Sequence, residues 1–307
     1  MFAITFRGET SKLKKVMGID IGGTKVRLGV LNENGEVLSD KIIPTQLPLY
    51  PYLEEQILSI QAANPDLTGI GIGTRGMVDA KTGTVTFEKE LEGWEGTPVK
   101  AQLEKATGLR TELNNDANCA ALAEVRLGSA RSFEKVICIT VGTGLGAGVV
   151  FDGEIMNGSH GGAGEVGHLI LYPNGRACGC GKNGCSEQYV SGTAIRRMIK
   201  ENNVIDPATG ELVLPQALFQ LAAKGNESAI AVRERFLSDF AIVIATLQAV
   251  LDMDCVVVGG GVSESADDWW DLLLEKVEPL KLSPLELRRA AFGNEAGMLG
   301  AGMLVID

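Results

Sequence analysis

The sequence repeats one pattern of strand, glycine turn and strand 120 residues further along. At this spacing Ile19 corresponds to Ile139, Gly22 to Gly142, Val30 to Val150 and Asn32 to Asp152. A repeat at a fixed offset is typical of duplicated units that pack against each other. A chain of 307 residues, 45% of them apolar and 22% charged, is long enough for two such globular units. We therefore predict two related domains that face each other.

Turn residues and apolar runs give a coarse outline of the secondary structure. The first copy of the pattern begins at Val16 as a meander of strands, and 69–74 is a short buried strand. The segment 294–304 carries small residues three or four apart, which is typical of a helix packed closely on a neighbour. Further helices are predicted over 52–63, 98–107, 117–127, 187–200 and 236–251.

Charge and apolar runs exclude several classes of function. No run of 18 apolar residues exists, so no membrane span is expected. Residues 1–15 lack the long apolar run of a secretory signal, so we expect a cytoplasmic protein. We expect these residues to be a disordered lead-in or an upstream extension. The net charge of −11 is unfavourable for a nucleic-acid surface, which needs clustered Lys and Arg. Small molecules are the expected partners.

The glycine-rich stretch 161–187 holds a complete tetrahedral set of metal ligands. One imidazole and three thiolates come from His168, Cys178, Cys180 and Cys185. Structural zinc sites use such closed sets, whereas a catalytic zinc keeps one position open for water. The other cysteines lie in apolar contexts typical of a core: Cys119, Cys138 and Cys255. Thiolates stay free for metal in an intracellular protein, so we predict a structural Zn²⁺ site.

Three glycine-rich turns follow apolar strands, at 22–25, 142–148 and 259–261. Glycine lets backbone amides converge on a phosphate, because positive φ carries no Cβ penalty and nothing blocks close approach. One such turn mostly makes a hairpin, but three of them favour a nucleotide triphosphate held between two domains. Asp20 is then expected as an outer-shell partner of Mg²⁺, and Thr24 or Thr143 as hydroxyl donors to phosphate.

Asp116 is the predicted catalyst, because it stands between a strand end and a helix start, where α/β folds present functional groups. The same position suits a helix N-cap. Helix N-terminal donors are expected to keep Asp116 ionised and therefore a weak base. This is compatible with phosphoryl transfer, whose loose transition state needs an oriented acceptor more than a strong base.

A set of polar side chains near the cysteines suits a ligand with several hydroxyls: Asn115, Glu165, His168 and Glu187. A carboxylate accepts from two hydroxyls, and this distinguishes a sugar from an apolar molecule of similar size. His168 is expected to place one ring nitrogen on zinc and the other on a substrate hydroxyl. The alternatives are a solvated loop for the two glutamates and simple metal ligation for His168.

Together these blocks resemble the ROK family of repressors and sugar kinases, from about Val16 to the C-terminus. The motifs are DIGGTK at 20–25, NDAN at 115–118, GTGLGAG at 142–148, GGAGEVGH at 161–168 and CGCGKNGCSE at 178–187. The resemblance implies the α/β, actin-like ATPase (ribonuclease H-like) fold with two domains about a cleft, ATP and Mg²⁺ as cosubstrates, and a homodimer. It implies an N-terminal domain of 1–118 plus 294–307 and a C-terminal domain of 119–293.

By motif position, the resemblance implies that Asp116 is the catalytic base. The sugar contacts implied are Gly76, Asn115, Asp116, Glu165, His168 and Glu187. The nucleotide contacts implied are Asp20, Gly22, Gly23, Thr24, Lys25, Gly142, Thr143, Gly144, Gly260 and Gly261. One departure stands beside the sugar contacts: where family members often carry Pro-Gly after the strand at 69–74, this chain has Arg75 and Gly76.

The predicted function is an ATP-dependent sugar kinase that converts glucose to glucose 6-phosphate. An N-acetylhexosamine kinase acting on N-acetylmannosamine or N-acetylglucosamine, or a fructokinase, is the alternative within this class. A sugar-responsive repressor is disfavoured, because the 19 residues before Asp20 are too few for a helix-turn-helix domain. A non-catalytic sugar sensor is expected to lose Asp116 or a phosphate turn, and this chain keeps them.

Overall fold

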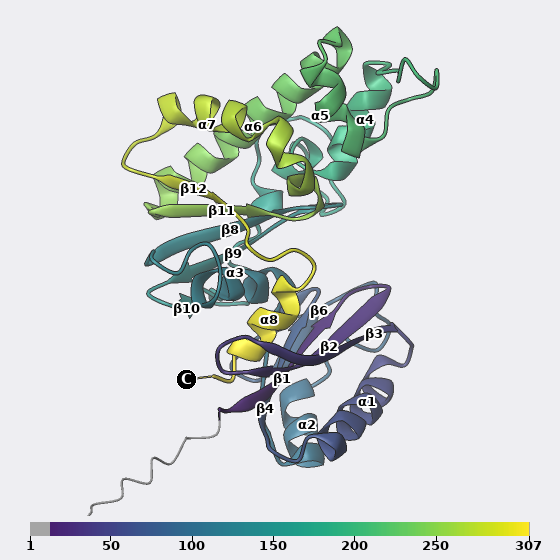
Figure 1. Cartoon of the computed structure of the whole chain (residues 1–307), viewed down its shortest axis with the longest axis vertical. Helices are drawn as coiled ribbons and strands as arrows, with labels where there is room; N and C mark the ends of the chain where they lie inside the picture. The colour runs from purple at the N-terminus through teal and green to yellow at the C-terminus, as the bar shows by residue number, and fades with distance from the viewer. Residues whose placement is uncertain (1–12, 307) are drawn as a thin grey trace, which may run out of the picture.

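The computed structural model describes residues 13–306 and contains two five-stranded sheets with the same topology (Figure 1). In spatial order, the first sheet contains β3 (Val37–Pro44), β2 (Lys25–Asn32), β1 (Lys15–Ile21), β4 (Leu67–Thr74) and β7 (Arg110–Asn115). The second contains β10 (Glu154–Ile155), β9 (Leu145–Phe151), β8 (Lys135–Val141), β11 (Cys255–Gly259) and β12 (Glu286–Arg289). The interpretation of residues 1–12 as a lead-in lies outside the described residues.

Each sheet begins with an antiparallel meander, to which two further strands add in parallel. β1 and β8 lie 120 residues apart, as the repeat predicts. The offset changes after the turn, because Met17 pairs with Val30 whereas Ile137 pairs with Val149. The predicted match of Val30 with Val150 is therefore wrong by one residue. The second turn is one residue shorter than the first, so the duplication is structural but not at one constant spacing.

Helices cover the outer face of each sheet (Figure 1). On the first sheet these are α1 (Leu49–Ala63) and α2 (Val99–Thr107), and on the second α4 (Gly192–Glu201), α5 (Pro215–Ala223), α6 (Glu227–Leu251) and α7 (Trp270–Val277). On α1, Leu53 and Ile57 are fully buried four residues apart, so one stripe faces the sheet. Burial of each such side chain contributes about 1.5–3 kcal/mol.

Short elements complete the chain. A two-stranded sheet pairs β5 (Met77–Asp79) with β6 (Thr84–Phe87). Single-turn and irregular 3₁₀ segments are η1 (Val166–His168), η2 (Ser186–Gln188), η3 (Gly261–Asp268) and η4 (Glu278–Leu280). The helix predicted over 187–200 is thus divided into η2 and α4, because the Ser191 side chain caps α4 by accepting from the Ala194 amide. The predicted start of α6 at 236 is nine residues late, since Asn226 caps a polar first part.

Two helices, α3 (Asp116–Arg126) and α8 (Ala296–Met303), lie between the sheets (Figure 1). α8 packs on β1 and β4, α3 packs on β8 and β9, and the two helices contact each other. A Cβ atom on Gly300 would lie 1.6 Å from the carbonyl oxygen of Cys119, so only glycine fits there. The prediction of a closely packed small-residue helix is confirmed. Within residues 13–306, none of the helices has the length and apolarity that crossing a membrane requires.

Candidate active site

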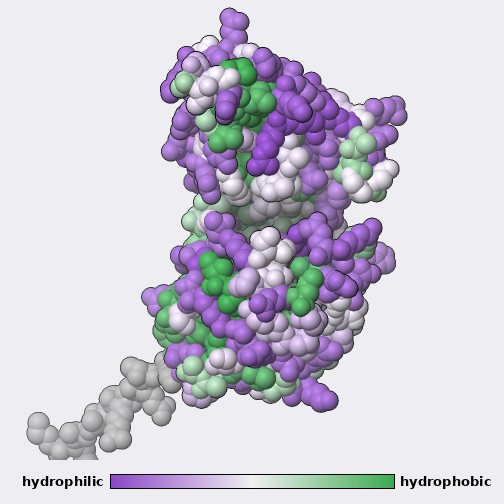
Figure 2. All heavy atoms as spheres, turned by 90° about the vertical axis from the view of Figure 1, so that its right-hand side faces the viewer, coloured by the Kyte–Doolittle hydropathy of each residue, from purple (hydrophilic) through white to green (hydrophobic). Residues whose placement is uncertain are grey.

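A cleft of about 620 Å³ lies between the two halves of the molecule and receives residues from both. Figure 2 shows a hollow between the two lobes, with a largely hydrophilic surface around it. Ten of the predicted site residues line this cleft: Asp20, Lys25, Gly76, Asp116, Gly142, Thr143, Gly144, Glu165, Glu187 and Gly260. The predicted catalyst, the second and third glycine turns, Lys25 of the first turn and the polar loop therefore converge on one space.

Other predicted residues lie outside that lining: Gly22, Gly23, Thr24, Asn115, His168 and Gly261. Gly261 lines a neighbouring pocket, and His168 faces the cysteine cluster. The Asn115 side chain is engaged within the protein. Its Oδ1 accepts from the amides of Ala117 and Asn118, and its Nδ2 donates to the Gly76 carbonyl at 3.0 Å. Asn115 is therefore the N-cap of α3, and the N-cap alternative for Asp116 is wrong.

The two hairpin turns close in the same way. The Gly22 amide donates to the Lys25 carbonyl at 2.9 Å, and the Gly142 amide donates to the Gly144 carbonyl at 3.0 Å. Positive φ, expected at the turn glycines, occurs among them only at Gly260 within the described chain. The hairpin geometry does not need it elsewhere. A Cβ on Gly142 would meet nothing within 4 Å, so this glycine leaves open space over the turn.

Glu187 ties the second turn to the polar loop. The Leu145 amide donates to its Oε2 at 3.0 Å. A Cβ on Gly144 would lie 2.4 Å from the same oxygen, so the carboxylate would have to shift if this residue carried a side chain. One carboxylate oxygen is thus used inside the protein, and the side chain still lines the cleft.

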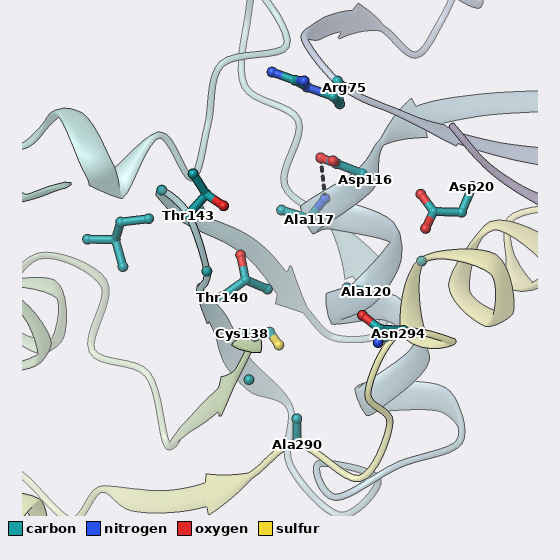
Figure 3. A pocket seen from close by; sticks show the side chains of 18 of the residues that line it. Asp20, Arg75, Asp116, Ala117, Ala120, Cys138, Thr140, Thr143, Ala290 and Asn294 are labelled. Carbon is teal, nitrogen blue, oxygen red and sulfur yellow. Dashed lines mark hydrogen bonds between the residues drawn. The ribbon is translucent and has the colours of Figure 1, made fainter. Parts of the chain in front are cut away.

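Asp20 and Asp116 enter the cleft from β1 and α3 (Figure 3). The Asp116 Oδ1 accepts from the Ala117 amide at 2.8 Å. Burial nevertheless raises the pKa of Asp116, and the helix amides and the Arg75 charge only reduce this rise. The expectation of a carboxylate kept weakly basic by the helix is wrong, because desolvation outweighs the helix donors.

Asp20 is also perturbed. Burial, and next the negative charge of Asp116, raise the pKa of Asp20 from 3.8 to about 6, against the opposing charges of Lys25 and Arg27. Two carboxyl groups with raised pKa values in one cleft indicate a site that gains from a bound cation.

The predicted metal ligands form one cluster. One donor atom from each of His168, Cys178, Cys180 and Cys185 lies within 4.8 Å of the others. The Cys178 Sγ is 3.8 Å from the His168 Nδ1, and the Cys180 Sγ is 3.6 Å from the Cys185 Sγ. The Nε2 of His168 lies 4.0 Å from the Glu165 Oε2. The two ring nitrogens thus face the thiols and the cleft glutamate.

Residues that sequence reasoning missed come from helix faces and from the β4–β5 turn. A neighbouring pocket of about 660 Å³ shares Gly142 and Thr143 with the cleft and is otherwise lined by α4, α5 and η3, including Ile195, Arg196, Phe219, Val262 and Ser265. No motif marks these positions, since they are ordinary helix residues. Arg75 also lines the cleft, and its only sequence signal was the departure from Pro-Gly.

Two α/β sheets of the same topology about a shared cleft are the arrangement of the actin-like ATPase fold. The model of the ROK family matches residues 16–307, and the chain belongs to this family. A glucokinase from Thermotoga maritima is 30% identical over 95% of this chain and 97% of its own length. An N-acetyl-D-glucosamine kinase from Yersinia enterocolitica is 30% identical over 94% of this chain and 98% of its own.

Solved structures give the same family. A ROK hexokinase from Thermus thermophilus superposes with a TM-score of 0.81 at 36% identity, covering 94% of this chain and 97% of the other. A ROK family glucokinase from Streptomyces griseus, in complex with glucose and AMPPNP, superposes with a TM-score of 0.76 at 31% identity, covering 94% and 98%.

Proposed function

We propose that the protein is an ATP-dependent hexose kinase that phosphorylates glucose to glucose 6-phosphate. The observation that carries this proposal is the position of Asp116, which lies in one cleft with the glycine turn at 142–144 and the glutamates of the polar loop. Glucokinase relatives at about 30% identity over nearly the whole chain support the same function.

The geometry supports a continuous path for ATP. Because Gly142 and Thr143 line both pockets, the base and ribose fit the pocket of α4, α5 and η3 while the phosphates cross the turn into the cleft. The sugar then lies against Gly76, Glu165, Glu187 and the Nε2 side of His168. Asn115 acts there by holding the Gly76 carbonyl and the start of α3.

The transfer step follows from this arrangement. The sugar hydroxyl oxygen forms a bond to the γ-phosphorus, and the bond between that phosphorus and the bridging β–γ oxygen breaks. The hydroxyl proton passes to the Asp116 carboxylate, and ADP leaves. The raised pKa of Asp116 makes it a better acceptor than an ordinary aspartate.

A divalent cation fits the charges of the cleft. Asp20 and Asp116 repel each other, which contributes to the raised pKa of Asp20, and hard oxygen ligands of this kind are those that Mg²⁺ takes in phosphoryl transfer. Bound Mg²⁺ supplies charge neutralisation for the phosphates of ATP. Asp20 is the residue that we assign to the metal, directly or through water.

The cysteine cluster suits structural zinc. A tetrahedral zinc with bonds of about 2.3 Å to sulfur places neighbouring sulfurs about 3.8 Å apart, close to the 3.6 Å between the Sγ atoms of Cys180 and Cys185. Cys180→Ala is expected to lose the bound zinc and to lower the melting temperature, measured by metal analysis and thermal unfolding. Lys182→Ala changes an exposed side chain of the same loop and is the matched control. One full zinc equivalent in the Cys180 variant would contradict this ligand set.

We also propose the division into two domains, on the packing of the two central helices. The packing of α8 on β1 and β4 supports placing 294–307 with residues 1–118, and the packing of α3 on β8 and β9 supports a boundary near 118. The homodimer and the cytoplasmic location stay predictions.

The experiment that tests the function is a coupled ADP-release assay with glucose, mannose, fructose, N-acetylglucosamine and N-acetylmannosamine. We expect the highest kcat/KM with glucose. A preference for an N-acetylhexosamine favours the alternative that the Yersinia relative represents. Activity with none of the five sugars overturns the kinase proposal and favours a sugar sensor.

A further inference from the structure

Arg75 stands on a turn that the protein holds rigidly. The preceding Thr74 is fully buried, and its Oγ1 accepts from the Trp94 Nε1 at 2.9 Å. On the other side, Gly76 has a φ of 88° and its carbonyl accepts from the Asn115 Nδ2. The backbone of Arg75 is therefore fixed from both sides, directly beside the N-cap that presents Asp116.

Arg75 lines the cleft on the same side as Asp116. In Figure 3 it extends beside Asp116, and its positive charge opposes the rise in the pKa of that carboxyl. It also packs on the first glycine turn, since a Cβ on Gly23 would lie 2.7 Å from the Arg75 Nη1. Arg75 therefore touches the turn of the N-terminal half and neighbours the base.

The charge balance of the cleft shows what this cation can do. Among the described residues of the lining, the negative charges are Asp20, Asp116, Glu124, Glu165 and Glu187, and the positive charges are Lys25 and Arg75. A phosphoryl group in transfer carries negative charge on three equatorial oxygens. Arginine offers a planar fork of donors that matches such oxygens, which a lysine does not.

The present partner of Arg75 is easily exchanged. The Arg75 Nη1 is 2.6 Å from the Glu90 Oε2, and the two side chains are 36% and 66% exposed. An exposed ion pair of this kind contributes at most about 1 kcal/mol. The pair also lines a side pocket of about 470 Å³ that shares Thr143, Gly144 and Glu187 with the cleft, so the guanidinium has space to move toward the second turn.

We propose that Arg75 leaves Glu90 when both substrates are bound and donates hydrogen bonds to the phosphoryl group that passes from ATP to the sugar. Arg75 carries no proton in this step; it stabilises the charge on the phosphoryl oxygens and afterwards holds the phosphate of the sugar phosphate product. This inference rests on the proposed kinase function and assigns an added residue to its site.

The test compares Arg75→Ala, Arg75→Lys and Glu90→Gln in the full-length protein, with steady-state kinetics for glucose and ATP and inhibition by glucose 6-phosphate. We expect Arg75→Ala to lower kcat on the order of 10- to 100-fold, because a lost donor to transition-state charge has effects of this size or larger. Its KM for glucose should change less than about threefold. The inhibition constant for glucose 6-phosphate should rise about 10-fold, a loss of about 1.4 kcal/mol in product binding.

Arg75→Lys should restore part of kcat. The acid limb of the pH profile should move to higher pH in Arg75→Ala, because the positive charge that lowers the pKa of Asp116 is lost.

Glu90→Gln separates this role from a structural one. If Arg75 acts on the phosphoryl group, removal of its competing partner leaves kcat at or above the wild-type value. If the Arg75–Glu90 pair matters only as a structural brace, Glu90→Gln loses as much kcat as Arg75→Ala, and the proposal is overturned. Arg288→Ala removes another exposed guanidinium that pairs with a glutamate, outside the cleft lining, and is the matched control.

Two further outcomes are distinct. Arg75→Ala and Arg75→Lys with wild-type kcat and unchanged product inhibition, in an enzyme that is active on glucose, overturn the role of Arg75 and leave the kinase function standing. A wild-type protein that releases no ADP with any of the five sugars overturns the proposed function itself.

Discussion

The two hairpins that open the two sheets share a backbone and differ in charge. The position of Asp20 at the end of β1 corresponds to Thr140 at the end of β8. The first turn includes Lys25, whereas the second is one residue shorter and closes at Gly144 without a charged side chain. Instead, the second turn receives the Glu187 carboxylate on the Leu145 amide. The first hairpin thus carries its own acid and cation, whereas the second has no charged side chain of its own and receives a carboxylate from another segment.

The difference assigns distinct tasks to the two halves. The N-terminal half supplies Lys25 and Arg75, the two cations of the cleft lining, and Asp20 and Asp116, whose pKa values are raised. The C-terminal half supplies backbone amides, hydroxyls and the carboxylates of Glu124, Glu165 and Glu187, but no cation of the described lining. Substitutions at matching positions are therefore expected to have unequal effects.

The largest expected effect comes from substituting Asp116, the proposed proton acceptor in the N-terminal half. Asp116→Asn removes the proton acceptor while keeping the size of the side chain, so we expect kcat to fall about 10³-fold with glucose binding still measurable. Turnover by the ADP-release assay and glucose binding by calorimetry test this together. A variant with near-normal turnover would remove Asp116 from the role of base.

The next effect compares the two matching strand ends directly. Asp20→Asn should lower kcat/KM on the order of 100-fold and shift the Mg²⁺ requirement upward, because a charged ligand is lost. Thr140→Val, at the corresponding position of the other half, should cost about 5-fold, since one neutral hydrogen bond contributes about 1 kcal/mol. Equal losses in the two variants would contradict the division of tasks.

A third substitution tests the contact between the halves. Gly300→Ala places a Cβ against the backbone of α3, which cannot yield as a side chain would, so the free energy of unfolding should fall by about 1–3 kcal/mol. Denaturant unfolding measures this. Gly293→Ala is the control, because its Cβ would meet nothing within 4 Å. Similar stability of both variants would show that α3 and α8 separate easily.

The smallest expected effect is on stability as a function of pH. The folded chain binds a proton at Asp20 with a pKa of about 6, above the value of 3.8 for the unfolded chain. This contribution to stability is fully present below pH 3.8 and is lost as the pH rises through 6. Without ligands, Asp20→Asn should therefore raise the melting temperature at pH 8 but not at pH 4. An equal shift at both values would mean that the proton on Asp20 is not the cause.

The sequence alone predicted those features that local chemistry determines. Alternating apolar runs and glycine turns located the hairpins, and ligand types and spacing located the cysteine cluster. The placement of Asp116 followed from a strand that ends where a helix starts. Its pKa did not follow, because desolvation depends on what the rest of the chain packs around the carboxyl.

Features that arise from tertiary packing could not be predicted from the sequence. The pocket of α4, α5 and η3 is made by helix faces that meet only in the fold, and the start of α6 was hidden by a polar first part. Arg75 was visible only as an exception to a family pattern. Its position against Gly23 and Asp116 could not be predicted from the sequence, because these residues come from three separate segments that meet only in the fold.

In the proposed site, we expect the carboxylate of Glu187 to link sugar binding and ATP binding thermodynamically. One of its oxygens accepts from the Leu145 amide, in the turn that we propose for the nucleotide, and the group also lines the space proposed for the sugar. A sugar hydroxyl that orders this carboxylate also orders the turn before ATP arrives. Reciprocity then requires ATP to tighten sugar binding by the same factor as sugar tightens ATP binding. We therefore expect sugar and ATP to bind with positive heterotropic cooperativity within a single chain.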